Sequence, residues 1–465
     1  MKTRIAATLI AVTVQLQNPG LCEDKKSVET SAAKSTATKA AKPAATAFVG
    51  AKIIDGSGRA AIDNGTLIIE GNRVKSVSPA STAKIPAGAK VVDAKGLTIM
   101  PTLIDGHAHL GLLKGESADT RNQSEENDLR QLRRFARYGI GAVVSLGTDE
   151  DFIYSMRERQ QKGELADCPM ILTAGHGFGI KGGAPPIEGK IDDLAYRPAN
   201  EAEARKDIDE LAAHKANLVK MWLDNLGGKV PAMKPELYKA IIDEAHKKKL
   251  KVAAHISQLA DAKALVNSGV DILAHSVRDL PVDTEFISAM TTHKVWIIPT
   301  LYLDEVCFTF ADPGVLDNLK KNKFFTDALD DGILDYLGSK RYHPKPEERK
   351  ALALAQKNLR ALNEAGVNIS FGTDAGALPE RIQGFGEHRE LELMVASGLS
   401  PMQAIHCATE NAAMMLGVAD KLGTLKEGKL ANFIVLSADP LKSISNTQMI
   451  QSVWLNGKKI PDSQH

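Results

Sequence analysis

Two histidines one residue apart, His107 and His109, are the clearest candidates for chemistry in this 465-residue sequence. They follow an apolar run from Leu97 to Ile104, which predicts a buried strand with both histidines at its carboxyl end. In an extended backbone, side chains two positions apart share a face, so both imidazoles can reach one metal ion. Paired histidines also occur at surfaces and in ordinary hydrogen-bonded pairs, so the spacing alone leaves both interpretations open.

Four later apolar segments also end in a side chain capable of metal chemistry. They run over residues 217–220, 251–255, 271–275 and 368–374, and they end in Lys220, His255, His275 and Asp374. Each predicts a short buried strand. Neutral imidazoles and a carboxylate are ligands of borderline divalent ions such as zinc, and six candidates exceed what one tetrahedral ion needs. The set therefore predicts two divalent metal ions.

Lys220 is the unusual member of this set, because an ammonium group beside a cation would be repelled. Apolar residues flank it on both sides, namely Leu218, Val219, Met221 and Trp222. Burial among them should lower the pKa of the ammonium group. A neutral amine can add carbon dioxide, and the resulting carbamate is an anion able to bridge two metal ions. A lysine that extends outward or pairs with an acid is the structural alternative, and by spacing alone it ranks first.

The elements that must position these residues alternate between strands and helices. Eight strand-then-helix units occupy residues 101–422, with helices expected near 125–138, 151–162, 201–214, 235–246 and 347–365. This alternation predicts an α/β fold with a parallel (β/α)8 barrel of the TIM type, whose strands all end at one face. The six candidate residues would therefore surround one point.

Short alternating strands with turn residues lie on both sides of the predicted barrel. They occupy residues 47–100 and 423–465, and we expect them to form one small β-sandwich assembled from the N- and C-terminal segments. Residues 303–350 are rich in aromatic side chains and too long for a simple connection between two barrel strands. We interpret this insertion as a lid over the barrel mouth, although a structural insertion explains it equally well.

The amino terminus has the layout of a secretory signal peptide. Lys2 and Arg4 precede an apolar stretch over residues 5–16, which is too short to span a membrane. We therefore expect a signal peptide over residues 1–22, a flexible linker over residues 23–46, and a mature protein that is secreted or periplasmic. A cytosolic chain with an unusual amino terminus is the alternative.

The overall composition limits the kinds of partner. Lys and Arg number 58 against 57 Asp and Glu, a net charge of +1, which argues against an electrostatic nucleic-acid or membrane partner. The four cysteines show no paired spacing, so neither a disulfide framework nor a zinc-cysteine module is expected. We expect a small-molecule or dipeptide substrate, no membrane span, and a homo-oligomer.

In their order along the chain, these motifs resemble the binuclear metal-dependent amidohydrolase superfamily. The resemblance rests on His107-Ala-His109, Lys220, His255, His275 and Asp374, and on the segments Pro101–His109, Ala274–Ser276, Gly372–Ala375 and Gly423–Leu436. It covers about residues 47–460. The most similar branch is that of imidazolonepropionase- and prolidase-like enzymes, many of them exported and acting on amide bonds of dipeptides or acylated amino acids.

The resemblance implies a division of roles among the six candidates. His107 and His109 would hold the more buried ion with Asp374. His255 and His275 would hold the other ion, and carbamylated Lys220 would bridge the two. Metal-activated water would attack a carbonyl polarised by the second ion, and Asp374 would take the proton and deliver it to the leaving nitrogen.

Four further residues are candidates for substrate binding: His176, Arg278, Tyr342 and His388. His176, at the end of the third strand, would bind the carbonyl oxygen or a substrate carboxylate, with a satisfied core histidine as the alternative. Arg278 would pair with a carboxylate, although most such arginines serve structural ion pairs.

These observations favour an exported metal-dependent hydrolase of amide bonds, a dipeptidase or carboxypeptidase acting on N-aminoacyl or N-acyl amino acids. A lactonase, esterase or phosphotriesterase would use the same binuclear site, because the same nucleophile attacks each of these groups. A non-catalytic metal-binding barrel is a third interpretation, since a fold never guarantees activity.

Overall fold

The described part of the chain begins inside the segment predicted to be a linker. The computed structural model describes residues 45–185, 194–225, 228–339 and 345–461. The predicted signal peptide, residues 23–44 of the predicted linker, and Tyr342 lie outside these ranges. Strand β1 begins at Ala45, so the predicted start of the β segment at Ala47 was too late.

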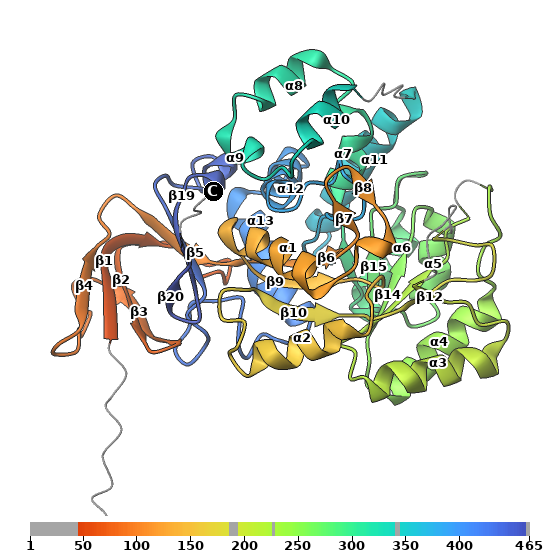
Figure 1. Ribbon diagram of the computed structural model, residues 1–465, viewed down its shortest axis with the longest axis horizontal. Helices are drawn as coiled ribbons and strands as arrows, with labels where there is room; N and C mark the ends of the chain where they lie inside the picture. The colour runs from red at the N-terminus through yellow and green to blue at the C-terminus, as the bar shows by residue number, and fades with distance from the viewer. Residues whose placement is uncertain (1–44, 186–193, 226–227, 340–344, 462–465) are drawn as a thin grey trace, which may run out of the picture. The chain divides into compact units, whose positions relative to one another are not determined.

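The central part of the chain has the predicted α/β architecture, with parallel strands separated by helices (Figure 1). The main strands are β6 (Leu103–Ala108), β9 (Ile140–Ser145), β10 (Met170–Thr173), β13 (Val219–Trp222), β14 (Val252–His255), β15 (Ile272–Ala274), β16 (Trp296–Ile298) and β17 (Asn368–Ile369). β6, β9 and β10 form one parallel sheet. β13 to β17 form a second one with the short strands β11 (Gly177–Phe178) and β12 (Ala195–Tyr196).

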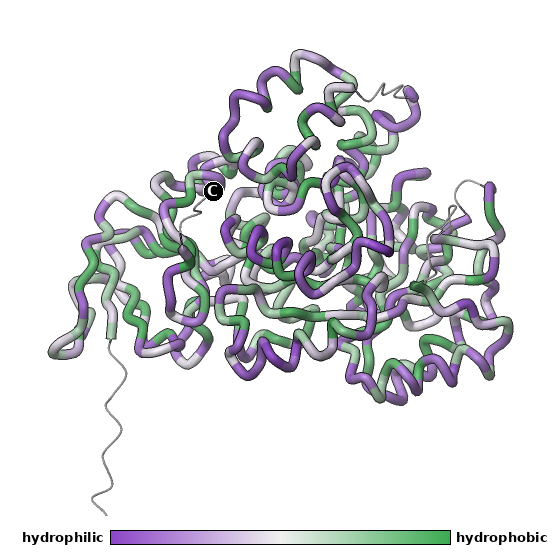
Figure 2. Tube along the Cα trace, viewed as in Figure 1, coloured by the Kyte–Doolittle hydropathy of each residue, from purple (hydrophilic) through white to green (hydrophobic). Residues whose placement is uncertain are grey.

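Helices lie between these strands, close to where the apolar periodicity predicted them. They include α1 (Glu125–Arg137), α2 (Phe152–Gln161), α3 (Glu201–Ala213), α4 (Pro235–Lys247), α5 (Leu259–Val266), α6 (Thr284–His293), α11 (Pro346–Glu364) and α12 (Phe385–Ala396). In α4, Pro235 occupies the first turn, while Leu237 and Ile241 belong to the buried face. Figure 2 shows the resulting alternation of hydrophilic and hydrophobic residues along the helices. Among the described residues, no helix is long and apolar enough to cross a membrane.

Backbone hydrogen bonds connect the two parallel sheets at their edges. At one edge the Asn217 N–H donates to the Thr173 carbonyl at 2.9 Å. At the other, the Gly106 N–H donates to the Phe371 carbonyl at 3.0 Å, and the Asp374 N–H donates to the His107 carbonyl at 2.7 Å. The second set of bonds brings the segment after β17 beside the end of β6, where the two histidines lie.

Strands from both ends of the described chain form one eight-stranded sheet. Its order is β20-β19-β18-β5-β1-β2-β3, and β4 pairs with β1. The strands are β1 (Ala45–Ile53), β2 (Ile62–Glu70), β3 (Arg73–Pro79), β4 (Lys90–Asp93), β5 (Thr98–Pro101), β18 (Phe433–Leu436), β19 (Ile450–Leu455) and β20 (Lys458–Lys459). The rings of Phe433 and Trp454 stack at 5.5 Å and belong to a hydrophobic core on this sheet.

The apolar run from Leu97 to Ile104 is divided between two strands. Its first part is β5, which pairs with β1 and β18, and its last part begins β6 in the parallel sheet. β5 ends at Pro101, which has no N–H to continue a ladder. The run therefore passes from one sheet to the other.

The long insertion folds into helices whose aromatic side chains pack inward. It contains most of α7 (Leu301–Thr309), α8 (Pro313–Leu319), α9 (Lys323–Thr326), α10 (Ile333–Ser339) and the start of α11. Phe308, Phe310 and Phe325 are buried in the main hydrophobic core. The Phe325 ring meets the Phe385 ring of α12 edge-on, with centroids 5.0 Å apart. These aromatic residues therefore hold the insertion against α12.

Shorter elements complete the described chain. They are β7 (Leu113–Lys114), β8 (Ser117–Ala118), α13 (Pro401–His406), a π-helical turn at Cys407–Asn411, α14 (Ala412–Met415), and 3₁₀ turns at Thr120–Asn122 and Ile444–Gln448.

Candidate active site

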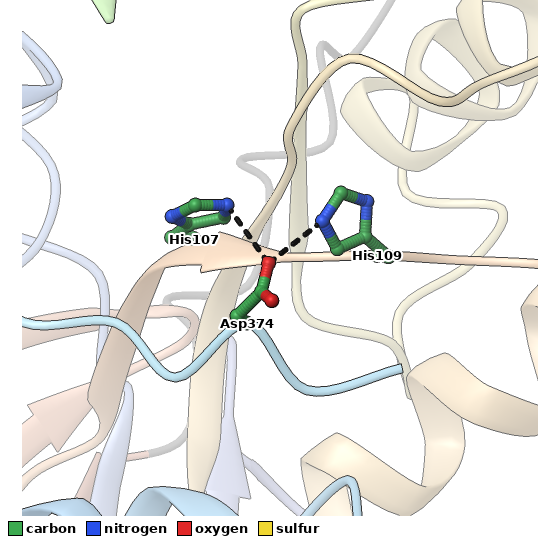
Figure 3. Close-up of side chains that lie close together, drawn as sticks. All are labelled: His107, His109 and Asp374. Atoms are coloured by element: carbon green, nitrogen blue, oxygen red, sulfur yellow. Dashed lines mark hydrogen bonds and ion pairs between the residues drawn. The ribbon is translucent and has the colours of Figure 1, made fainter. Parts of the chain in front are cut away.

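His107 and His109 point from the end of β6 toward one carboxylate, that of Asp374 (Figure 3). Their Nε2 atoms lie 3.1 Å and 3.0 Å from Oδ1 of Asp374. The two histidines are only 1% and 5% exposed. Within the described ranges, this is the one group of three metal-ligating side chains whose ligand atoms lie within 4.8 Å of one another. Two imidazoles and a carboxylate that converge in this way fit a divalent metal ion.

Two of the candidate imidazoles are oriented by hydrogen bonds in which Nδ1–H donates to a threonine hydroxyl, the tautomer that leaves Nε2 free. Nδ1 of His109 and Oγ1 of Thr148 lie 2.7 Å apart. The same distance, 2.7 Å, separates Nδ1 of His275 from Oγ1 of Thr300. With Nδ1 engaged, each ring offers Nε2 to a metal ion.

Positive φ angles mark the backbone at this site. Asp374 has a φ of 60°, His275 of 80° and Thr300 of 46°. Residues other than glycine rarely adopt these angles, which cost about 1–3 kcal/mol each and persist only where the surroundings enforce them. Local backbone strain therefore coincides with the candidate ligands.

Lys220, at 0% exposure, is one of the largest fully buried side chains. Its Nζ has no hydrogen-bond partner in the described part of the protein, and it lies 5.4 Å from the centre of the Trp222 ring. Burial lowers the pKa of this amine to about 7, although the negative charge of Asp374 opposes the shift. The surroundings therefore favour the neutral amine, as the apolar neighbours in the sequence predicted.

His255 and His275 lie beside this group, linked to it through ring contacts. The ring centroids of His255 and His275 are 4.3 Å apart, and those of His275 and His107 are 4.7 Å apart. Burial is the main reason that the pKa of His255 falls to about 4 and that of His107 to about 3. Burial and the two neighbouring imidazoles lower the pKa of His275 well below its usual value. All three rings are thus neutral, which is the form that binds metal ions.

Asp224 is a buried acid near His255 that the sequence analysis missed. Its Oδ2 lies 3.4 Å from Nε2 of His255, and the residue is 6% exposed. Asp224 follows the apolar strand that carries Lys220, so it shows the same signal as the predicted ligands, a polar side chain at the end of a buried strand. This position after a buried strand was sufficient to identify Asp224 as a candidate.

Two further buried acids, Asp105 and Glu387, lie close to the histidine pair. Asp105 accepts a hydrogen bond from the His107 N–H at 2.8 Å and one from the Thr373 hydroxyl at 2.6 Å. The same hydroxyl lies 3.0 Å from Oε1 of Glu387. Burial raises the pKa of Asp105 to about 6, and burial together with Asp105 raises the pKa of Glu387 well above its usual value. Both shifts favour the protonated form of these acids, which lie next to the backbone of His107.

Of the predicted substrate-binding residues, His176 lies near the group. It forms an isolated β-bridge with Thr148, the residue that orients His109. Its Nε2 is buried, and among the described residues it has no hydrogen-bond partner. This free ring nitrogen is compatible with the predicted contact to substrate.

The other substrate-binding predictions have different outcomes. Arg278 pairs with Asp304, with Nε 3.4 Å from Oδ1, and its side chain remains 18% exposed. His388 does not fit the predicted role, because it is fully buried and its ring nitrogens bond Oγ1 of Thr447 and the Tyr138 carbonyl, both at 2.9 Å. Neither nitrogen remains for a substrate. Tyr342 lies outside the described residues.

Arg381 is a further residue that the sequence analysis did not identify. Its Nη1 contacts Oδ2 of Asp374, on the opposite side of the carboxylate from the histidines. Burial alone would raise the pKa of Asp374, but the charge of Arg381 and the contacts with His107 and His109 hold it well below its usual value. Arg381 lies in the irregular segment before α12, where no periodic pattern could have pointed to it.

Comparisons with known proteins agree with this site. The amidohydrolase family model matches residues 98–460. An imidazolonepropionase of Flavobacterium psychrophilum is 24% identical over 425 residues, covering 86% of this chain and 92% of the relative. An ochratoxinase of Aspergillus niger is 28% identical over 235 residues, covering 48% of this chain and 41% of the relative.

A solved structure extends the likeness to the fold. The crystal structure of a putative prolidase from Bifidobacterium longum superimposes with a TM-score of 0.71 at 24% identity, covering 90% of this chain and 95% of that one. The family model spans most of the described chain and includes every candidate metal ligand. The chain therefore belongs to the amidohydrolase family, which confirms the resemblance seen in its motifs.

Proposed function

We propose that this protein is an exported metal-dependent hydrolase of amide bonds, with dipeptides or N-acyl amino acids as substrates. Family membership supports hydrolysis of carbon–nitrogen bonds, and the similarity to proteins named imidazolonepropionase and prolidase supports this class. The observation that carries the proposal is the convergence of His107 and His109 on Oδ1 of Asp374, at 3.1 Å and 3.0 Å.

The proposal includes a closed barrel. The eight parallel strands are connected at both sheet edges by backbone hydrogen bonds, Asn217 to Thr173 and Gly106 to Phe371, which supports closure into a (β/α)8 barrel with the candidate ligands at one face. The eight-stranded sheet would fold over its own core as the small β-sandwich.

Two divalent ions, with zinc as the best match to the donor set, would occupy the site. One would be held by His107, His109 and Asp374. The other would be held by His255 and His275. When bound, the ions supply a nucleophilic water at neutral pH and polarise the scissile carbonyl.

Lys220 would bridge the ions as a carbamate. Its nitrogen attacks carbon dioxide, a C–N bond forms, and the nitrogen releases one proton, so the side chain becomes an anion. Its complete burial, its lack of a hydrogen-bond partner among the described residues and its pKa near 7 support this reaction. Burial lowers the stability of an ammonium group in the same place.

The remaining steps depend on side chains around Asp374. Asp374 would accept the proton of the attacking water and deliver it to the leaving nitrogen. His176, through its unpaired Nε2, would donate to the carbonyl oxygen or bind a carboxylate. Arg278 would pair with a substrate carboxylate. The insertion over residues 303–350 would cover the mouth of the site, since α7 contributes Asp304 beside Arg278.

A substrate panel tests this function. Zinc-loaded protein would be assayed with dipeptides, N-acyl amino acids, lactones and phosphotriesters, and we expect turnover of the first two classes. Turnover confined to lactones, esters or phosphotriesters would replace the proposal with the second function. Bound zinc without turnover of any class would favour a non-catalytic metal-binding barrel.

The proposed location is secreted or periplasmic. It rests on the basic and apolar amino terminus of the sequence. Mass spectrometry of the protein from its native host should show loss of roughly the first 20 residues, whereas an intact amino terminus on cytosolic protein would refute export.

A further inference from the structure

A positive charge that the proposed mechanism does not use faces the candidate site. Arg381 contacts Oδ2 of Asp374 through Nη1, while Oδ1 of the same carboxylate faces His107 and His109. The Nε of Arg381 is buried, and no described residue accepts a hydrogen bond from it. The side chain nevertheless keeps 17% of its surface exposed. Arg381 therefore has donors to spare beyond its contact with Asp374.

Arg278 pairs with Asp304, a buried acid on α7 that also feels the charge of Arg381. Nε of Arg278 lies 3.4 Å from Oδ1 of Asp304, and Oδ2 of Asp304 has no hydrogen-bond partner in the described ranges. Burial raises the pKa of Asp304, and the charges of both arginines oppose that shift. Both guanidinium groups thus lie within electrostatic reach of one carboxylate.

The helix that carries Asp304 is held in a fixed position. Glu390 accepts hydrogen bonds from the N–H groups of Leu301 and Tyr302 at the start of α7, at 3.0 Å and 2.7 Å. The residue before α7, Thr300, bonds Nδ1 of His275. Asp304 and the two arginines around it are therefore tied to the candidate metal ligands rather than to a separate surface.

Once a metal ion is bound at Asp374, the positive charges of this cluster outnumber the negative charges left to offset them. Arg278 and Arg381 carry two positive charges, and Asp304 and Asp374 carry two negative ones. Under the proposed function, Asp374 faces a metal ion through Oδ1, so its charge no longer offsets an arginine. Two guanidinium groups then share the single carboxylate of Asp304. This arrangement favours an additional anion, and the planar guanidinium fork matches a carboxylate in particular.

We propose that Arg381 and Arg278 together bind the free carboxylate of the amino acid released by hydrolysis, and so restrict the enzyme to substrates that end in a carboxylate. This inference rests on the proposed function and narrows its substrate class. Asp304 acts as a positioning residue for Arg278, with which it forms an ion pair, and Asp374 has the same part for Arg381.

A matched pair of substrates tests the inference. N-acetyl-L-phenylalanine and N-acetyl-L-phenylalaninamide share the same acetyl–nitrogen bond and differ only in the carboxylate, so kcat/KM for release of the free amine gives an acid-to-amide ratio. Because both substrates use the same Asp374, any indirect effect of a substitution on that residue cancels in the ratio.

Four variants would be compared with the wild type. Arg381→Met and Arg278→Met should each lower the acid-to-amide ratio about 10- to 100-fold, the range for loss of a charge-assisted hydrogen bond. Arg381→Lys should keep part of the preference. Arg389→Met is the control, because Arg389 also pairs with α7, through Nε to Glu305 at 2.8 Å, and lies outside the proposed receptor. It should keep the wild-type ratio.

The outcomes separate this inference from the function on which it rests. A ratio that is unchanged in Arg381→Met overturns the role of Arg381, and a fall of equal size in Arg389→Met shows a general effect of α7 instead.

If the wild type cleaves neither compound nor any dipeptide, the proposed function fails. Calorimetry with the same two compounds then decides the inference: at least about tenfold tighter binding of the acid to wild type, lost in Arg381→Met, supports it. Equal binding of acid and amide refutes it.

Discussion

Nε2 of His109 lies 3.0 Å from Oδ1 of Asp374, although 265 positions separate the two residues in the sequence. The contact forms because the segment after β17 hydrogen-bonds the end of β6, with the Asp374 N–H donating to the His107 carbonyl at 2.7 Å. Strand pairing therefore brings together the two ends of the α/β part of the chain. The same carboxylate offers Oδ1 to the histidines and Oδ2 to Arg381, so Asp374 contacts both the candidate metal-binding histidines and a positive charge.

Replacing Asp374 with Asn should remove proton transfer while leaving the fold in place. We expect Asp374→Asn to lower kcat by at least about a hundredfold, the lower range for loss of a general base. Steady-state assays with the best substrate of the panel, alongside thermal unfolding curves, would measure this. Near-normal turnover in a folded variant would exclude Asp374 from the mechanism.

Lys220→Ala tests the bridge between the two proposed ions. The variant should lose most activity and at least one metal ion per chain, because no other anion would occupy the bridge. Added short-chain carboxylic acids should restore part of both. Metal analysis and activity would be measured on the same samples, and a variant with two ions and full turnover would rule out the carbamate.

Thr148→Val tests the orientation of His109. The substitution removes the hydroxyl that lies 2.7 Å from Nδ1 of His109 and keeps a side chain of similar shape. Loss of such an orienting contact should weaken metal affinity about 10- to 100-fold, measured by competition with a chelator. Thr291→Val is the control. The Thr291 hydroxyl lies at an exposed position of α6 and donates to the Ile287 carbonyl of the same helix. Equal affinities in the two variants would contradict the orienting role.

Phe325→Ala tests whether the insertion belongs to the core. Phe325 is fully buried and packs edge-on against Phe385, so the substitution should lower the free energy of unfolding by about 3–5 kcal/mol. Val315→Ala, at an exposed position on α8, should cost far less. Denaturant unfolding of both variants measures the difference, and similar stabilities would show that the insertion packs only loosely.

The candidate ligands could be predicted because each lies in or after a short apolar strand, and parallel strands end at one face. Asp224 also follows a short apolar strand, but the sequence analysis did not consider it as a candidate. Arg381 could not be predicted, since it lies in an irregular segment and its position depends on the contact with Asp374. The aromatic residues of the insertion left a lid and a structural insertion equally open, and the packing of Phe310 and Phe325 into the core gives these two side chains a structural role. Composition alone does not distinguish a buried aromatic side chain from one that covers a substrate.

The run from Leu97 to Ile104 crosses the border between two predicted segments, residues 47–100 and 101–422. In the structure β5 ends at Pro101 and β6 begins at Leu103. The particular pairing of β5 with the distant strand β18 could not be predicted, because long-range pairing leaves no mark in a local pattern.

Zinc titration into metal-free protein tests whether hydrolysis depends on metal ions bound at His107 and His109. Protein stripped with a chelator would receive increasing zinc while hydrolysis of a dipeptide is followed. We expect negligible turnover without metal and a rise that ends near two zinc ions per chain, with no such rise in a variant that carries His107→Ala and His109→Ala. Full turnover by the stripped protein, or an unchanged response in that variant, would contradict this dependence.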